Sequence, residues 1–189
     1  MCHESEQGES SLIFGYESSL DFAGHAFGVD SDEWRGALAA IDADLSELHD
    51  ALPDDVVLLV TADHGMVDIN IENRFDVVDH PELLDDVVVF AGEARFRHLH
   101  TKAGAEIKVA AAWASALGDR AEVRLRENAQ DWFGPLDPRV APRFGDVVVA
   151  ALGDFGVFHS DQYAIELRMK GFHGSITDVE RRIPVLYSN

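Results

Sequence analysis

Apolar side chains recur at alternating spacings of four and three residues between positions 34 and 52. The positions that carry them are Trp34, Leu38, Ile41, Leu45, Leu48 and Leu52. This spacing places one apolar stripe along a helix. Asp30 or Ser31 can cap its start, with Glu33 three residues after Asp30 in a capping-box arrangement, and Pro53 ends it. The pattern predicts an amphipathic helix that packs one face on a core.

Apolar runs lie on both sides of this helix. Before it, "SLIFGY" at residues 11–16 predicts a short buried strand, followed by a loop-like segment that contains Gly24 and Gly28. After it, "DVVLLVT" at residues 55–61 is typical of a strand in a parallel sheet that is covered on both faces. Strand, helix and strand in this order predict an α/β fold, with a site at the carboxyl end of a strand.

The middle of the chain has a different organisation. Strands are predicted at residues 86–92, 94–101, 121–126, 143–152 and 162–169. Residues 103–118 form an alanine-rich helical pattern closed by Gly118. We interpret roughly residues 85–160 as an inserted α+β lobe within a single partial domain that spans residues 1–189. Thr177 and Glu180 form a second capping-box pattern near the end of the chain.

The net charge of the chain excludes some classes of binding partner. The 189 residues are enough for one domain with a substantial core, and they carry a formal net charge of -20 at pH 7. Such a surface repels nucleic acid and anionic membranes, so neither is expected as a partner. A phosphate-bearing substrate stays possible, because bound metal ions can invert the sign of the field locally.

Cysteine and targeting signals are almost absent. Cys2 is the only cysteine, so an internal disulfide and a cysteine-type zinc site are both excluded. The first residues, "MCHESEQGESS", have no basic patch followed by an apolar stretch, and no apolar run reaches transmembrane length. As written, the chain is expected to be cytoplasmic, and any metal site must use histidines and carboxylates.

Three segments combine histidine or aspartate with glycine. "LDFAGHAFG" carries Asp21 and His25 four residues apart, so one turn of helix or a tight loop can bring both to a single ion. "TADHGM" carries Asp63 and His64, which can converge only where a strand ends and bends. The third segment, "GFHGS", carries His173.

Two aspartates and three histidines form a mixed nitrogen and oxygen donor set. Such a set suits zinc or manganese and fits calcium poorly. No single segment is specific, because each histidine alone is more often an ordinary loop residue than a ligand. His98 and His100 could also bind metal, but the alternation of a strand explains their spacing.

Together and in this order, the motifs resemble the type I phosphodiesterase and nucleotide pyrophosphatase family of the alkaline phosphatase superfamily. The resemblance runs from about residue 12 to the C-terminus. It is carried by "LDFAGHAFGVDSDEW", "LLVTADHGMVD", "RFGDVVV" and "HGSITDVERRIPVL". It implies an alkaline-phosphatase-like, three-layer α/β/α core.

The resemblance also implies a role for each of the five residues. Asp21, His25 and His173 would be the protein ligands of one divalent metal ion. Asp63 and His64 would contribute to a second, with zinc the expected metal in both positions and manganese the alternative. The implied reaction is hydrolysis of a phosphodiester or pyrophosphate bond in a phosphate-ester or nucleotide substrate, through a covalent phosphoryl-enzyme intermediate.

The sequence departs from the family pattern upstream of Asp21. Members carry a further aspartate ligand and a threonine or serine nucleophile far before this motif, whereas twenty residues precede Asp21 here. The serines among them are Ser5, Ser10, Ser11, Ser18 and Ser19. None is expected to follow a strand or open a helix, so the catalytic residue stays unassigned.

We therefore expect a C-terminal half of the family fold, truncated at its N-terminus. Loss of the leading strands would leave an unpaired sheet edge that could mediate self-association. Whether the chain is itself an enzyme stays open. The alternatives are a non-catalytic metal-binding or interaction module, and a related phosphonate hydrolase or phosphomutase.

Overall fold

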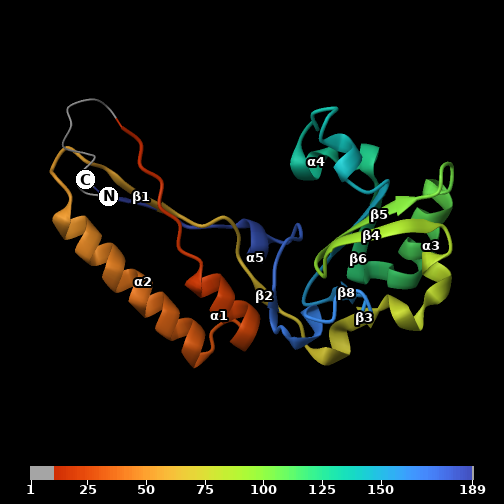
Figure 1. Ribbon diagram of the computed structural model, residues 1–189, viewed down its shortest axis with the longest axis horizontal. Helices are drawn as coiled ribbons and strands as arrows, with labels where there is room; N and C mark the ends of the chain where they lie inside the picture. The colour runs from red at the N-terminus through yellow and green to blue at the C-terminus, as the bar shows by residue number, and fades with distance from the viewer. Residues whose placement is uncertain (1–10, 189) are drawn as a thin grey trace.

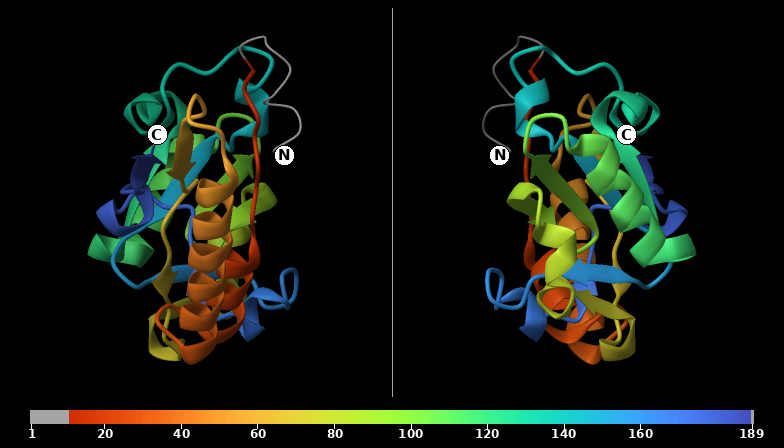
Figure 2. Two further views of the ribbon diagram at one scale, coloured as in Figure 1. Left: turned by 90° about the vertical axis from the view of Figure 1, so that its left-hand side faces the viewer. Right: turned by 90° about the vertical axis from the view of Figure 1, so that its right-hand side faces the viewer.

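The fold is known from a computed structural model that describes residues 11–188. Cys2, Ser5 and Ser10 lie outside the described residues. Figures 1 and 2 show two helices and a two-stranded sheet at one end of the molecule, and a four-stranded sheet at the other. One of these two helices carries Asp21 and His25.

Helix α2 (Asp32–Ala51) confirms the predicted amphipathic helix. Ser31 is the cap, because its Oγ accepts a hydrogen bond from the main-chain N–H of Trp34 at 3.1 Å. Asp30 instead adopts a positive φ of 67° and forms an ion pair with Arg35. Most side chains of the apolar stripe are half-buried, and Leu38 is 42% exposed.

The segment before α2 differs from the prediction. Residues 19–27 form helix α1 (Ser19–Phe27) where a loop was expected, so Asp21 and His25 lie on one helical turn. Residues 11–16 form no strand, because no strand pairs with them among the described residues, and Leu12 and Phe14 stay exposed. The expectation that no serine opens a helix is wrong for Ser19.

The predicted strand at residues 55–61 is present but pairs differently. Strand β1 (Leu58–Thr61) pairs antiparallel with β10 (Val185–Ser188). Leu59 and Val185 are 62% and 64% exposed. The apolar run at residues 55–61 predicted parallel neighbouring strands and a sheet covered on both faces. Among residues 11–188, β1 has no parallel neighbour, and its sheet is not covered on both faces.

The four-stranded sheet has the order β4-β5-β7-β6, and every pairing is antiparallel. Its strands are β4 (Val87–Glu93), β5 (Phe96–Thr101), β6 (Ala121–Leu125) and β7 (Val147–Ala151). Helix α3 (Glu106–Leu117) packs on this sheet and buries Trp113, whose Nε1 donates a hydrogen bond to the carbonyl oxygen of Leu83 at 2.9 Å. His98 lies on β5, as predicted, and its Nδ1 accepts a hydrogen bond from the N–H of Gly145.

Short elements connect the two ends. Strand β2 (Val67–Asp68) pairs antiparallel with β9 (Gly171–Phe172), and β3 (Arg74–Asp76) pairs parallel with β8 (Gly156–Phe158). The remaining α-helices are α4 (Gln130–Phe133) and α5 (Asp178–Arg181). The 3₁₀ helices are η1 (Ile71–Asn73), η2 (Val77–Asp79), η3 (Pro81–Leu84), η4 (Gly118–Arg120), η5 (Arg126–Asn128), η6 (Ala141–Arg143) and η7 (Glu166–Arg168).

The predicted strand at residues 162–169 is wrong. This segment consists of turns and η7, with local hydrogen bonds such as that from the N–H of Glu166 to the carbonyl oxygen of Tyr163. Alternating apolar residues suit a strand only where a neighbouring strand takes up the main-chain groups. Here the main chain satisfies them locally.

These elements form a mixed α/β fold, as predicted from the sequence. The four-stranded sheet and α3 fall within the lobe expected at residues 85–160, whose boundaries stay a prediction. Over residues 11–188, none of the helices has the length and apolar character needed to span a membrane.

Candidate metal centre

Helix α1 places Asp21 and His25 one turn apart on the same face. Nε2 of His25 lies 3.4 Å from Oδ1 of Asp21. The other ring nitrogen, Nδ1, forms a hydrogen bond with the carbonyl oxygen of Gly171 at 2.8 Å. Because a carbonyl oxygen only accepts, this contact assigns a proton to Nδ1. In the neutral ring, Nε2 then keeps a free electron pair for a metal ion.

Strand β9 leads directly into His173. Nε2 of His173 lies 3.6 Å from the same Oδ1 of Asp21. Asp21, His25 and His173 each offer one ligand atom, and these three atoms lie within 4.8 Å of one another. The fold therefore brings together two segments that are far apart in the sequence.

The approach of α1 to β9 depends on Gly171. A Cβ at this position would lie 2.5 Å from the carbonyl oxygen of Gly24 and equally close to Sδ of Met66. The main-chain N–H of Lys170 also donates a hydrogen bond to the carbonyl oxygen of His25 at 2.8 Å. Only a residue without a side chain allows this approach of two backbones.

The Oδ1 atom of Asp21 is buried and has no hydrogen-bond partner among the described residues. A buried carboxylate oxygen without a partner is costly, since it has lost its water and gained nothing in return. A cation between this oxygen and the two imidazole nitrogens would compensate it. One carboxylate and two neutral imidazoles form a donor set that zinc and manganese accept. These residues fit a divalent metal ion.

Asp63 and His64 lie just beyond β1 and beside this cluster. The ring of His64 stacks on that of His173, with centroids 3.6 Å apart and planes 15° from parallel. Nδ1 of His64 contacts the carbonyl oxygen of Gly65 at 3.0 Å, and Nε2 lies 3.7 Å from Oδ1 of Asp63. All five residues singled out in the sequence therefore lie in one region, three converging on one point and two next to it.

Comparison with known proteins matches this arrangement to a family. The model of the family "Type I phosphodiesterase / nucleotide pyrophosphatase" matches residues 2–176. The chain belongs to this family. Members are metal-dependent, and the Asp21, His25 and His173 cluster is the candidate metal site of this member. No curated protein matches the chain.

Solved structures show the same fold. Murine ectonucleotide pyrophosphatase/phosphodiesterase 5 is similar to the chain at 20% identity with a TM-score of 0.68, and a second structure of it, inactive and in complex with AMP, gives the same values. The human protein gives 21% identity and a TM-score of 0.65. Each comparison covers 88% of this chain and 44% of the other. The chain thus has the alkaline-phosphatase-like fold of these structures and spans less than half of their length.

Burial affects the protonation of one candidate ligand of this family site. Burial lowers the pKa of His173 below its ordinary value, and the neighbouring His64 acts in the same direction. Asp21 and the exposed carboxylate of Glu93 oppose the shift. The net result favours the neutral imidazole, which is the form that binds a metal ion.

Tyr16 is a residue of the site that the sequence did not indicate. Its hydroxyl donates a hydrogen bond to Oδ2 of Asp63 at 3.4 Å. The negative charge of Asp63 raises the pKa of Tyr16, so the hydroxyl stays protonated. Tyr16 falls in the segment expected to be a buried strand, and a single sequence holds no signal that would place it beside Asp63.

Proposed function

We propose that this chain takes part in the metal-dependent hydrolysis of phosphodiester or pyrophosphate bonds. Asp21, His25 and His173 would hold one divalent ion, and Asp63 and His64 would contribute to a second. Zinc is the proposed metal and manganese the alternative. The observation that carries the proposal is the buried Oδ1 of Asp21, which lacks a hydrogen-bond partner among the described residues and faces two imidazole nitrogens.

The charge of the molecule supports metal dependence of any phosphate chemistry. With a formal net charge of -20, the protein repels a phosphate ester unless cations offset the charge locally. Divalent ions at such a site offset the charge of the substrate and polarise a phosphoryl oxygen. One structure of murine ectonucleotide pyrophosphatase/phosphodiesterase 5 is a complex with AMP. We therefore propose a nucleotide or related phosphate ester as substrate.

The residues of the chain have separate tasks in this proposal. His25 and His173 each present a ring nitrogen, and the ring of His25 is held by the carbonyl oxygen of Gly171. Asp21 supplies the negative charge that offsets the ion. Tyr16 keeps the carboxylate of Asp63 oriented through its hydroxyl. Neither the nucleophile nor a third ligand of the second ion is assigned to a residue of this chain.

Zinc binding provides the first test. Isothermal titration of the purified chain with zinc should show binding that His25→Ala and His173→Ala each weaken by more than about 100-fold, since each removes a direct ligand. His100→Ala is the matched control, because it removes a histidine of β5 that lies outside the cluster. Equal zinc affinity in all four proteins would contradict the proposed site.

Turnover is tested separately from metal binding. Hydrolysis of bis(p-nitrophenyl) phosphate is measured with zinc or manganese added, and His64→Ala serves as the comparison. Hydrolysis that this variant loses supports an enzyme. A folded chain that binds zinc without hydrolysis supports the alternative of a non-catalytic metal-binding module, which is favoured by the lack of an assigned nucleophile. A phosphonate substrate in the same assay distinguishes a related phosphonate hydrolase.

A further inference from the structure

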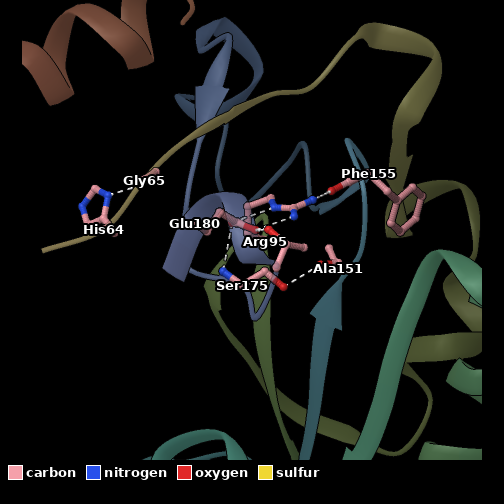
Figure 3. A network of polar contacts seen from close by, with 8 residues as sticks. His64, Gly65, Arg95, Ala151, Phe155, Ser175 and Glu180 are labelled. Atoms are coloured by element: carbon pink, nitrogen blue, oxygen red, sulfur yellow. Dashed lines mark hydrogen bonds and ion pairs between the residues drawn. The ribbon is translucent and has the colours of Figure 1, made fainter. Parts of the chain in front are cut away.

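A buried ion pair lies next to the candidate metal centre. Arg95, in the turn between β4 and β5, is fully buried, and Glu180 on α5 is 2% exposed. Nε of Arg95 donates a hydrogen bond to Oε1 of Glu180 at 3.0 Å, and Nη2 donates to Oε2 at 2.7 Å. This bidentate geometry fixes the orientation of the carboxylate in its plane. Figure 3 shows the pair at the centre of a network of polar contacts.

Two further donors complete the coordination of the carboxylate. The main-chain N–H of Ser175 donates to Oε1 at 3.1 Å, and the hydroxyl of Thr177 donates to Oε2. Burial alone would raise the pKa of Glu180, but the hydrogen bonds from Arg95 and Thr177 outweigh it and the pKa is lowered. Glu180 is thus a charged residue whose two oxygens each accept two hydrogen bonds.

The network also connects Glu180 to the four-stranded sheet. The third nitrogen of the guanidinium, Nη1 of Arg95, donates to the carbonyl oxygen of Phe155. The hydroxyl of Ser175 donates to the carbonyl oxygen of Ala151, at the end of β7, at 2.5 Å. The segment that follows His173 is therefore fastened to a rigid sheet rather than left as a free loop.

The same glutamate holds the other loop of the site. Its main-chain carbonyl oxygen accepts a hydrogen bond from the N–H of Gly65 at 2.7 Å. A Cβ at Gly65 would overlap the carbonyl oxygen of Val179, so the loop lies directly on the backbone of α5. Gly65 follows His64, and Ser175 lies two residues after His173. Both loops that carry the stacked rings are therefore attached to Glu180.

We propose that Arg95 and Glu180 are positioning residues that set the placement of the His64 and His173 rings relative to each other. Neither side chain is proposed to touch a metal ion or a substrate. They act through the main chain of Gly65 and Ser175. Loss of the pair removes the side-chain acceptor of the Ser175 N–H and frees α5 from Arg95, while the main-chain carbonyl of residue 180 still accepts from Gly65. The two loops then no longer share one fixed anchor, so the rings lose their stacked geometry.

A second buried pair provides a matched control. Arg97 lies on β5 and forms an ion pair with Glu166, with side chains that are 1% and 12% exposed. Its other hydrogen bonds go to the carbonyl oxygens of Gly92 and Val157. This pair has the same chemistry and a comparable depth, but its described hydrogen bonds do not lead to the segments around His64 or His173. Substituting the Arg97–Glu166 pair therefore distinguishes an effect on the position of the two histidine rings from an effect of losing any buried ion pair on the stability of the protein.

The variants to compare are Arg95→Met/Glu180→Leu and Arg97→Met/Glu166→Leu. Replacing both partners of a buried ion pair by apolar residues avoids an unpaired charge and often leaves stability unchanged. Thermal unfolding verifies that both proteins fold. If the first variant does not fold, Arg95→Lys takes its place, since lysine keeps the charge and loses the bidentate geometry.

The first measurement uses the metal-free protein. In the parent, the stacked rings should shift the imidazole Hε1 resonances of His64 and His173 upfield in the NMR spectrum. The Arg95 and Glu180 variant should lose this shift, and the Arg97 and Glu166 variant should retain it. The proposal is overturned if the shift survives in the first variant, or if both variants lose it.

The second measurement is zinc affinity, and this arm rests on the proposed function. Residues that orient metal ligands typically alter affinity by about 10- to 100-fold. We expect a loss in that range for the Arg95 and Glu180 variant and a change of less than about twofold for the control pair. Equal affinities overturn the consequence for metal binding. Absence of zinc binding in the parent contradicts the proposed function, whereas the ring resonances still decide the positioning role.

Discussion

The rings of His64 and His173 lie face to face, 3.6 Å between centroids, although they come from segments that are far apart in the sequence. His173 also reaches Oδ1 of Asp21 through Nε2 at 3.6 Å. One imidazole thus contacts both groups of candidate ligands. Its packing on His64 and its proposed ligation of a metal ion can be separated by substitution.

His173→Phe should preserve the stack and remove the ligand. A phenyl ring can pack on His64, so the thermal stability of the metal-free protein should change little. Zinc affinity should fall by more than about 100-fold, because a direct ligand is lost. His173→Ala should lose zinc affinity to the same extent and stability as well. Calorimetry of zinc binding and thermal unfolding distinguish the two, and equal stability of both variants would argue against the stacking contribution.

A side chain at Gly171 should separate α1 from β9. The added Cβ meets the carbonyl oxygen of Gly24 at 2.5 Å, and backbone cannot move away as a flexible side chain does. Gly171→Ala should cost about 1–3 kcal/mol of unfolding free energy, as overpacking usually does. It should also weaken zinc binding, since His25 lies on α1 and His173 directly follows β9, and these two elements are pushed apart.

Gly36 provides the opposite case on the same chain. It lies within α2, and an added Cβ would meet nothing within 4 Å among the described residues. Gly36→Ala should therefore stabilise the protein by about 1 kcal/mol through helix propensity, with zinc affinity unchanged. Denaturant unfolding measures the change in unfolding free energy of both variants, which should be an increase for Gly36→Ala and a decrease for Gly171→Ala. A destabilised Gly36→Ala, or an unaffected Gly171→Ala, would contradict the geometric explanation.

Sequence periodicity predicted the elements whose stability is local. The stripe from Trp34 to Leu52 specified α2, because three- and four-residue spacing has meaning within one helix. The segment at residues 11–16 has equally apolar character but forms no strand among residues 11–188, since a strand requires a neighbour. The antiparallel pairing of β1 with β10 was unpredictable for the same reason.

The sequence indicated the candidate residues of the site but not the buried ion pair that holds the loops around them. Glycine-bounded histidines and aspartates indicated the five residues because each of them lies in a short motif. The pair of Arg95 with Glu180 joins residues that are distant in the sequence, and one sequence contains no trace of such a contact. Thr177 and Glu180 did form a capping-box pattern, and their side chains do contact each other. A capping box would place the hydroxyl of Thr177 on a main-chain N–H, but Thr177 makes no side-chain cap hydrogen bond. The pattern therefore predicted neither the contact between the two side chains nor the buried arginine.

Exposed apolar residues on β1 and β10 predict self-association of the chain. Leu59 and Val185 are more than half exposed, and Tyr187 is 76% exposed. Light scattering should find a mass that increases with protein concentration, and Leu59→Lys should restore the monomer. Ile107→Lys is the matched control, because Ile107 is 70% exposed on α3, away from this sheet. A parent that stays monomeric throughout would contradict self-association through this edge.

The stability of the protein should fall below about pH 6.5 through His98. Burial lowers the pKa of His98 from its ordinary value of 6.5, with His100 acting in the same direction. The unfolded chain then binds more protons than the native protein in the range below 6.5, so stability is complete above that pH and lost as the pH falls. The slope contributed by one proton is at most about 1.4 kcal/mol per pH unit. His98→Gln retains an acceptor for the N–H of Gly145 and removes the titration, so its unfolding free energy should fall less steeply between pH 7 and 5 than that of the parent. A parental slope in His98→Gln would assign the pH dependence to another group.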